Sequence, residues 1–313
     1  MKLLVLREGV HGLSPSAYAE TLRDRLDGHT VRHASTPVEE REAIESADIA
    51  TGVSIGPSLL ERATKLRLFA CAYAGTGHLP LDSFATHDIA VTNAAGVHSA
   101  SASEHVIGSI LSFSRRLHDA ARADNWEVPS PYELAGSTVT IVGLGAIGTS
   151  VADRLEPFGV ETIGVRRSPD SGGPTDEIIG PDRLHEALAR SDFVVLCCPL
   201  TDETRGLIGT EEIATLSAEA VLVNVARGEV IDTDALVYAL QRGRLGGAAL
   251  DVTDPEPLPD DHPLWDLDDV LITPHTAGAT PTYYDRLADI VVDNVERIEA
   301  GHPLRNRVRI ETG

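Results

Sequence analysis

The sequence predicts an α/β protein of two domains, each a parallel β-sheet covered by helices. Three observations predict this class. Short apolar runs alternate with amphipathic helical stretches along the chain, which is the pattern of successive β-α units. The runs in the second half are apolar throughout, as in strands buried on both faces. The length of 313 residues suits two medium-sized domains, and 42% hydrophobic residues can supply a core for each.

The first alternation begins at the N-terminus. Residues 2–6 form an apolar run typical of a strand. Residues 16–26 have the pattern of an amphipathic helix that starts after Ser14 and Pro15. Further strand-like runs, each followed by glycine, proline or polar residues, cover residues 47–53, 66–72 and 90–92.

A long helical pattern without proline then covers residues 99–123, enough to cross between two domains. Residues 124–136 break this periodicity and place Trp126 and Tyr132 next to prolines. The segment is either a plain linker or an arm that packs on a second subunit, because aromatic residues are enriched in such interfaces.

The second alternation begins at Ser137. Its strand-like runs cover residues 138–142, 161–165, 193–197, 220–225, 247–250 and 270–272. A final helix is predicted over residues 282–300, ahead of a short tail.

The charge balance is strongly acidic. The chain has 48 acidic and 26 basic residues, a net charge of −22, and only Lys2 and Lys65 are lysines. Such a surface repels nucleic acids and anionic membranes, so we expect neither as a partner. The composition is either that of a merely acidic protein or, as we hypothesise, that of a halophile's protein, in which cations screen the self-repulsion.

Other composition features point to a cytoplasmic protein without a metal. The three cysteines include the adjacent Cys197 and Cys198 inside an apolar run, which predicts core residues rather than a disulfide framework. No run reaches the roughly 20 apolar residues of a membrane span, and the N-terminus does not have the pattern of a signal peptide. The acidic clusters at residues 260–262 and 266–269 lack convincing ligand geometry, so we expect no metal.

A glycine motif predicts dinucleotide binding. The strand-like run 138–142 leads directly into Gly143-Leu-Gly145-Ala-Ile-Gly148 and then into a helix over residues 149–155. In this context Gly143 permits the tight turn, Gly145 lets the backbone approach a pyrophosphate, and Gly148 lets helix and strand pack closely. The amides at the helix start would bind the phosphates.

The next predicted strand ends in Arg166, Arg167 and Ser168, where an acidic residue would bind the ribose of NAD. Two guanidinium groups and a hydroxyl favour a 2′-phosphate instead, which indicates NADP(H). The alternative is that the arginines are solvated surface charges and that the protein uses either cofactor.

Three segments at strand ends carry candidate catalytic residues. Arg227 follows an apolar strand, and its planar guanidinium can bind the carboxylate of a 2-ketoacid with two parallel hydrogen bonds. Glu256 stands between two prolines that fix its backbone. His275 follows Pro274 at a strand end and is a candidate general acid, whose protonated form a nearby carboxylate would favour.

The sequence resembles the D-isomer-specific 2-hydroxyacid dehydrogenase family over essentially the whole chain, and within it the glyoxylate and hydroxypyruvate reductase branch. The motifs that carry the resemblance are residues 143–148, 198–208, 224–228, 250–257 and Pro274-His275. The resemblance implies two Rossmann-like or flavodoxin-like domains, with a cofactor domain over residues 99–284 inserted into a substrate domain over residues 1–98 plus 285–313. It also implies a homodimer that reversibly reduces a 2-ketoacid to a D-2-hydroxyacid. The implied cofactor is NADP(H), with NAD(H) as the alternative.

The resemblance assigns the site residues as well. It implies that Arg227 binds the substrate carboxylate and carbonyl, that Glu256 orients and charges His275, and that His275 relays the proton. It implies substrate-binding backbone amides at Ala74 and Gly75, and contact of Asp251 with the nicotinamide carboxamide. The full implied cofactor set is Gly143, Gly145, Ala146, Ile147, Gly148, Arg166, Arg167, Ser168, Cys198, Pro199, Thr204, Val225, Ala226, Arg227, Asp251, His275 and Gly278.

Two alternatives remain open at the level of sequence. One is a short phosphoglycerate-type dehydrogenase, and the other is a dinucleotide-binding regulatory scaffold without turnover. The loop at residues 73–78 lacks the aspartate often found after its second glycine in the family, so the preferred ketoacid is undetermined. The presence of all three catalytic residue types favours turnover over a scaffold.

Overall fold

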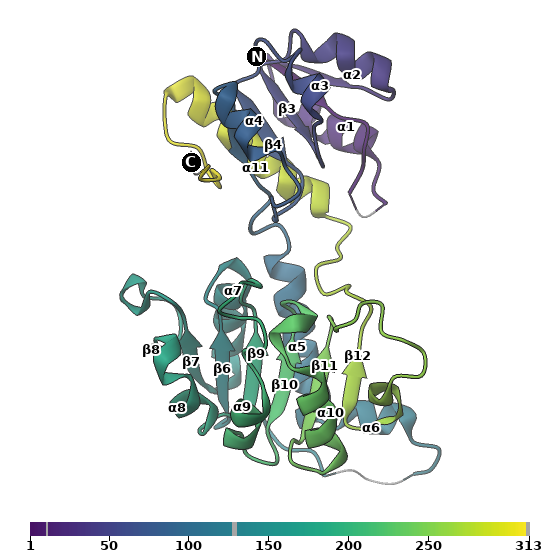
Figure 1. Ribbon diagram of the computed structural model, residues 1–313, viewed down its shortest axis with the longest axis vertical. Helices are drawn as coiled ribbons and strands as arrows, with labels where there is room; N and C mark the ends of the chain where they lie inside the picture. The colour runs from purple at the N-terminus through teal and green to yellow at the C-terminus, as the bar shows by residue number, and fades with distance from the viewer. Residues whose placement is uncertain (11, 127–129, 311–313) are drawn as a thin grey trace. The chain divides into compact units, whose positions relative to one another are not determined.

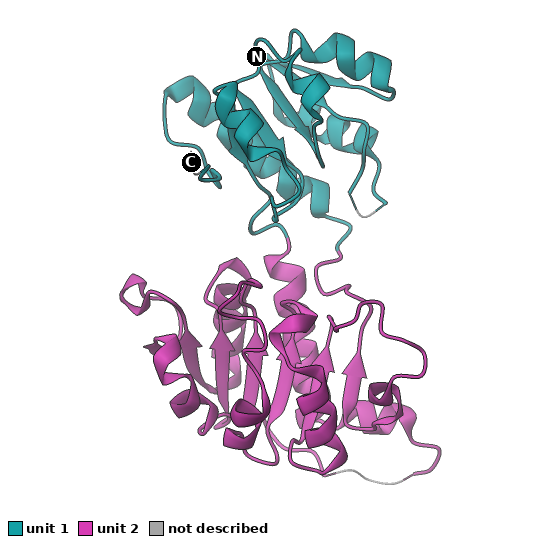
Figure 2. Cartoon of the chain, viewed as in Figure 1, with its two compact units in different colours: residues 1–97, 280–313 teal, residues 98–279 magenta. Residues whose placement is uncertain are grey.

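The computed structural model describes residues 1–10, 12–126 and 130–310. The chain divides into two compact units, unit 1 with residues 1–97 and 280–313, and unit 2 with residues 98–279 (Figure 2). Each unit contains one parallel sheet with helices between its strands, which confirms the predicted fold class. Unit 2 is inserted between the two segments of unit 1, with boundaries one and five residues before those drawn from the sequence.

Unit 1 is built on a five-stranded sheet in the order β2-β1-β3-β4-β5, in which every neighbouring pair is parallel (Figure 1). Its strands are β1 Lys2–Val5, β2 Thr30–His33, β3 Ile49–Gly52, β4 Leu68–Cys71 and β5 Ala90–Thr92. Its helices are α1 Pro15–Arg25, α2 Pro37–Ile44, α3 Pro57–Leu60, α4 Leu81–Thr86 and α11 Tyr283–Ala300.

Two apolar layers cover the faces of this sheet, because successive strand residues point to opposite sides. Leu3 and Val5 pack with α1 and α11, and Leu4 packs with α2, α3 and α4. The helix α11 comes from the far end of the chain and buries Tyr283 against the sheet. It therefore completes the core of unit 1.

Unit 2 holds a seven-stranded sheet in the order β12-β11-β10-β9-β6-β7-β8, again with parallel neighbours. Its strands are β6 Thr138–Val142, β7 Glu161–Val165, β8 Glu177–Ile179, β9 Phe193–Leu196, β10 Val221–Asn224, β11 Gly247–Leu250 and β12 Val270–Ile272. Its α-helices are α5 Ser99–Ser114, α6 Leu117–Arg122, α7 Ala146–Leu155, α8 Leu184–Leu188, α9 Thr210–Thr215 and α10 Thr233–Gln241. Short 3₁₀ segments are η1 Glu156–Phe158, η2 Pro169–Ser171, η3 Pro181–Arg183, η4 Gly228–Val230 and η5 Pro263–Asp266.

The core of unit 2 also has two layers. Helices α5 and α7 pack on one face of the sheet around Ile141 and Val195, and α8, α9 and α10 pack on the other face around Val194 and Leu222. Among the helices that the structure describes, none combines the length and the apolar character needed to cross a membrane.

The long helical pattern over residues 99–123 proves to be two helices, so the prediction of one continuous helix is wrong. Helix α5 ends at Ser114, and Arg116 has φ +54°, in the left-handed region, before α6 begins at Leu117. A left-handed residue turns the chain out of a right-handed helix. Helices α5 and α11 each lie wholly within one unit, so the chain passes between the units ahead of these helices.

The segment 124–136, predicted as a linker or an arm, includes residues 127–129, which lie outside the described residues. On either side of them Trp126 is 98% exposed and Tyr132 is 42% exposed. Tyr132 is tied back to the end of α5, because its N–H donates to the carbonyl of Ser114 at 2.9 Å and its carbonyl accepts from Arg115 at 3.1 Å.

Candidate active site

The candidate residues of unit 2 lie in loops that follow β6, β7, β9, β10, β11 and β12. Because neighbouring strands in this sheet are parallel, all these loops gather at the carboxyl edge of the sheet. The chain adds strands on one side of β6 up to β8 and then continues on the other side with β9 (Figure 1). Open α/β sheets bind their ligands at this kind of switch point.

The three glycines after β6 have different structural roles. Gly143 has φ +100°, and a Cβ there would lie 2.7 Å from the backbone N of Cys198. A Cβ on Gly148 would lie 2.0 Å from the carbonyl oxygen of Gly143. A Cβ on Gly145 would meet nothing within 4 Å, so this residue faces open space at the start of α7. Two glycines are thus needed for packing, and the third leaves room for a phosphate at the helix start.

A cavity of about 440 Å³ lies beside this glycine loop. It brings together eight of the predicted cofactor residues, namely Gly143, Gly145, Arg166, Arg167, Ser168, Cys198, Pro199 and Thr204. These residues come from the ends of three neighbouring strands, β6, β7 and β9. Its size is in the range of small-molecule and cofactor sites.

The two arginines at the rim of the cavity differ in their contacts. Arg166 donates to the carbonyl of Gly172, which fixes its guanidinium within its own loop. Arg167 pairs with Glu203 at 2.6 Å, and both side chains are nearly three-quarters exposed. Exposed ion pairs contribute little free energy, so the Arg167 guanidinium can exchange Glu203 for a phosphate.

The acid–base pair is formed by the loops after β11 and β12. The Nδ1 of His275 lies 2.6 Å from Oε1 of Glu256, with the two side chains 48% and 42% exposed. With Nδ1–H donating to the carboxylate, Nε2 is the nitrogen left to exchange a proton. His275 has φ +53°, and its backbone N–H donates to the carbonyls of Asp251 and Thr273 at 2.9 Å each. The structure thus brings together two residues predicted from separate segments.

Asp251 holds the loop that presents the histidine. Its carboxylate is buried and accepts hydrogen bonds from the Thr273 hydroxyl at 2.6 Å and from the N–H groups of Thr276 and Ala277 at 2.8 and 2.9 Å. These contacts span the loop on both sides of His275. Contact of Asp251 with a nicotinamide stays a prediction, since its oxygens are directed into this loop.

Arg227 is exposed on the neighbouring loop, where Nη1 donates to the carbonyl of Ala226. Behind it, the fully buried Asn224 donates to the Arg227 carbonyl at 2.9 Å and accepts from the Ala226 N–H at 3.0 Å. A Cβ on Gly228 would lie 2.0 Å from the carbonyl of Thr253, so the loops after β10 and β11 are in contact. Asn224 is a positioning residue that sequence reasoning did not assign, although a polar residue at the end of a buried strand was the available signal.

The remaining predicted contacts fall into two groups. Thr204, which lines the cavity, also donates to the Pro199 carbonyl at 2.6 Å. Gly278 serves local packing, because a Cβ there would lie 2.7 Å from Nδ1 of His98. The others are not among the residues that line the cavity, and their cofactor contacts stay predictions: Ala146, Ile147, Gly148, Val225 and Ala226.

The cysteines next to the cavity are not nucleophiles. Burial raises the pKa of Cys197 to about 12 and also raises the pKa of Cys198. A thiol must ionise to attack, so neither residue supplies a thiolate near neutral pH. This supports their interpretation as small core residues.

In unit 1, Ala74 and Gly75 lie in an exposed loop after β4. The loop is anchored by Asn93, whose Nδ2 donates to the Ala74 carbonyl at 2.7 Å. Their predicted role as substrate-binding amides stays a prediction.

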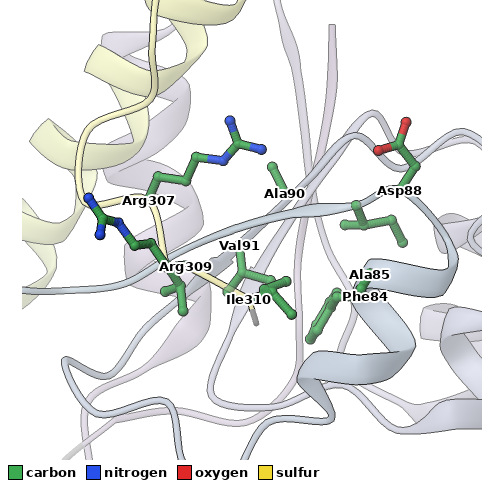
Figure 3. Close-up of a pocket in the computed structure, with 10 residues that line it drawn as sticks. Phe84, Ala85, Asp88, Ala90, Val91, Arg307, Arg309 and Ile310 are labelled. Atoms are coloured by element: carbon green, nitrogen blue, oxygen red, sulfur yellow. The ribbon is translucent and has the colours of Figure 1, made fainter. Parts of the chain in front are cut away.

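A second cavity, of about 730 Å³, lies in unit 1 between α4, β5 and the C-terminal segment (Figure 3). Its wall is largely apolar, with Phe84, Val91 and Ile310, and the C-terminal segment adds Arg307 and Arg309. The described lining residues include no histidine, so this cavity does not offer the acid–base pair found in unit 2.

A glycine loop beside a cavity at the switch point of a parallel sheet, with a paired histidine at the same edge, defines a dinucleotide-dependent oxidoreductase. Residues 107–277 match the family model described as the D-isomer specific 2-hydroxyacid dehydrogenase, NAD binding domain. The chain belongs to this family of NAD(P)-dependent enzymes, which reduce ketoacids.

Relatives agree with this assignment. The chain is 36% identical over 260 residues to a glyoxylate reductase of Thermofilum pendens, covering 79% of this chain and 76% of that one. A D-isomer specific 2-hydroxyacid dehydrogenase of Xanthobacter autotrophicus, solved with NADPH and MES, is 30% identical with a TM-score of 0.82 and 98% coverage of both chains. An NADPH-dependent glyoxylate/hydroxypyruvate reductase of Sinorhizobium meliloti, solved with NADP and sulfate, is 28% identical with a TM-score of 0.78 and the same coverage.

Proposed function

We propose that this protein reduces small 2-ketoacids, of the glyoxylate and hydroxypyruvate kind, to D-2-hydroxyacids with NADPH in preference to NADH. The observation that carries the proposal is the 2.6 Å hydrogen bond between His275 and Glu256 at the edge of the sheet that also bears the open glycine loop. An acid–base pair at the same sheet edge as a dinucleotide loop is the arrangement that carbonyl reduction requires.

The cofactor preference rests on the cavity. Gly145 faces open space where a pyrophosphate would lie, and Arg166, Arg167 and Ser168 line the same cavity at the end of β7. Cationic and hydroxyl groups there favour a 2′-phosphate over a bare ribose hydroxyl. When bound, the reduced nicotinamide would supply the hydride for the carbonyl carbon next to the substrate carboxylate.

Residues of this chain bind the substrate carboxylate and supply the proton for the carbonyl oxygen. Arg227 binds the substrate carboxylate and polarises the adjacent carbonyl with its planar guanidinium. The Nε2–H of His275 gives its proton to the carbonyl oxygen, which becomes the hydroxyl of the product. Glu256 stabilises the protonated ring through Nδ1 and sets its orientation. Proton balance is restored when water reprotonates the histidine, because half of its side chain is exposed.

Initial rates with glyoxylate, hydroxypyruvate, pyruvate and a branched 2-ketoacid, measured in molar KCl with NADPH and with NADH, test the proposal. Turnover with preference for NADPH is the expected result. Strong preference for NADH would keep the enzyme class and refute the role of the arginines. Dinucleotide binding without turnover of any ketoacid would favour the regulatory scaffold, and turnover confined to 3-phosphohydroxypyruvate would favour the phosphoglycerate-type dehydrogenase.

A matched pair of variants isolates the 2′-phosphate. Arg167→Ala should raise the Kd for NADPH about tenfold and leave the Kd for NADH unchanged, since a charge-assisted contact to an exposed phosphate is worth on the order of 1.4 kcal/mol. Arg190→Ala, which removes an arginine paired with Glu161 and Glu177 outside the cavity, is the control and should change neither.

We further propose a homodimer as the working form. The support is Trp126, 98% exposed beside the 127–129 segment, since isolated monomers rarely leave a tryptophan so open to water. Sedimentation equilibrium of the wild type and of Trp126→Ser measures this directly, and a wild-type mass of one chain would refute it.

A further inference from the structure

A second cluster of histidine and carboxylate groups lies at the opposite edge of the unit 2 sheet. His118 and Asp119 belong to α6, and Asp269 stands immediately before β12. Their candidate ligand atoms all lie within 4.8 Å of one another. The cluster is at the amino end of β12, whereas His275 follows its carboxyl end, so it is outside the candidate active site.

The proton on His118 can be placed from its contacts. The side chain is 1% exposed, and its ring packs on Phe113 with 4.4 Å between centroids. Nδ1 lies 3.0 Å from the carbonyl oxygen of Ser112. A carbonyl can only accept a hydrogen bond, so Nδ1 carries a proton, and in the neutral ring Nε2 presents a lone pair.

That lone pair faces a carboxylate. Nε2 is buried, lies 3.0 Å from Oδ1 of Asp119, and has no hydrogen-bond partner within the described part of the chain, because the contact lacks hydrogen-bond geometry. A lone pair and a carboxylate repel each other unless a positive charge lies between them. Histidines that bind metals show this same arrangement, with the other ring nitrogen donating to a backbone carbonyl.

The ligand set selects the kind of cation. One imidazole nitrogen with two carboxylates suits Zn²⁺ and similar first-row ions, whereas Mg²⁺ and Ca²⁺ prefer oxygen ligands alone. Two carboxylates also balance a divalent charge. Arg116 pairs with Oδ2 of Asp119 at 3.5 Å, which leaves Oδ1 facing Nε2 of His118. Arg122 donates to the backbone carbonyls of Asp268 and Val270.

We propose that His118, Asp119 and Asp269 bind one divalent cation of the Zn²⁺ type, which ties α6 to the start of β12. Tetrahedral ligands at about 2.0–2.1 Å from zinc are roughly 3.3 Å apart, so the cluster must close by about 1.5 Å at its widest. Asp269 can supply that movement because its side chain is exposed. The fourth position is left to water.

The test uses the metal-stripped full-length protein. Calorimetric titration with Zn²⁺ should show one saturable site per chain, and Co²⁺ should give visible d–d bands without a sulfur charge-transfer band, which separates this site from the cysteines. Asp269→Asn should weaken Zn²⁺ binding at least about tenfold, as loss of a ligand does, and its exposed position keeps the fold intact.

His185→Gln is the matched control, because His185 lies 3.2 Å from Glu212 on the same unit but outside the cluster, and it should leave Zn²⁺ affinity unchanged. Two results would overturn the proposal. One is the absence of saturable Zn²⁺ binding by the wild type, which would leave His118 and Asp119 as a simple ion pair. The other is equal affinity of the wild type and Asp269→Asn.

Discussion

Two histidines at opposite ends of β12 each contact a carboxylate, yet their surroundings differ. His275 lies beyond the carboxyl end of the strand, is half exposed, and makes a 2.6 Å hydrogen bond to Glu256 through Nδ1. His118 lies near the amino end, is 1% exposed, and has Nδ1 on a backbone carbonyl and Nε2 against Asp119 without a hydrogen bond.

The difference shows what decides a histidine's role. Where the carboxylate accepts a hydrogen bond from Nδ1–H and water reaches the ring, Nε2 can exchange a proton with a substrate. Where a backbone carbonyl accepts the hydrogen bond from Nδ1–H and water is excluded, Nε2 is directed at neighbouring oxygens and can serve as a ligand. The residue type is the same in both places. The acceptor that binds Nδ1–H and the exposure of the ring decide what Nε2 can do.

The largest effect is expected at the exposed histidine. His275→Gln should lower kcat for ketoacid reduction by about 10²–10⁴-fold, the usual contribution of a general acid, while NADPH binding is retained. Steady-state kinetics and fluorescence titration of the cofactor measure the two quantities. The same substitution at the other end, His118→Gln, should leave kcat nearly unchanged, and an equal loss in both variants would contradict the division of roles.

Glu256→Gln should have the next largest effect, lowering kcat about 10–100-fold, because it removes a charged hydrogen bond worth roughly 1.5–3 kcal/mol. Steady-state kinetics of ketoacid reduction measure this loss. A kcat equal to that of the wild type would refute the role of Glu256 in supporting His275.

His118→Gln should instead affect stability. Loss of a buried, hydrogen-bonded ring is expected to lower the free energy of unfolding by about 1–3 kcal/mol, measured by urea denaturation of the metal-free protein. His185→Gln, on an exposed site, is the control and should change it little. Equal unfolding free energies for the wild type and His118→Gln would show that the buried histidine contributes nothing to the fold.

The smallest effect is expected from salt, measured as a change in melting temperature. With a net charge of −22, the wild type should melt at a higher temperature in molar KCl than in low salt, because cations screen the self-repulsion. The melting temperature of His118→Gln should lie below that of the wild type at both salt concentrations, since buried groups are screened less than exposed ones. A wild-type Tm that stays flat or falls between low and molar KCl would refute the salt-adaptation hypothesis.

Much of the fold followed from local patterns. All of the strands predicted from apolar runs are present, and the central ones are buried on both faces, which leaves a continuous signal. Of the four edge strands, β5 and β12 were predicted and β2 and β8 were not. β2 reads Thr-Val-Arg-His and β8 has only two apolar residues, so neither produces an apolar run.

The functional residues of unit 2 also divide into those that the sequence predicted and those that only the structure revealed. The glycine motif and the segments of Arg227, Glu256 and His275 could be found in the sequence, since each follows a strand whose apolar run marks it. The contact between His275 and Glu256, the anchoring by Asn224 and Asp251, and the break at Arg116 were decided by the tertiary structure.

The His118 cluster depended on tertiary structure entirely. Asp269 belongs to the acidic cluster 266–269, for which the sequence predicts no metal, and nothing in the sequence pairs it with a histidine on a helix far earlier in the chain. The physical reason is that sequence periodicity records which side chains are buried within one element. Which buried nitrogen meets which carboxylate depends on how α6 packs against the edge strand, and only the folded chain fixes that.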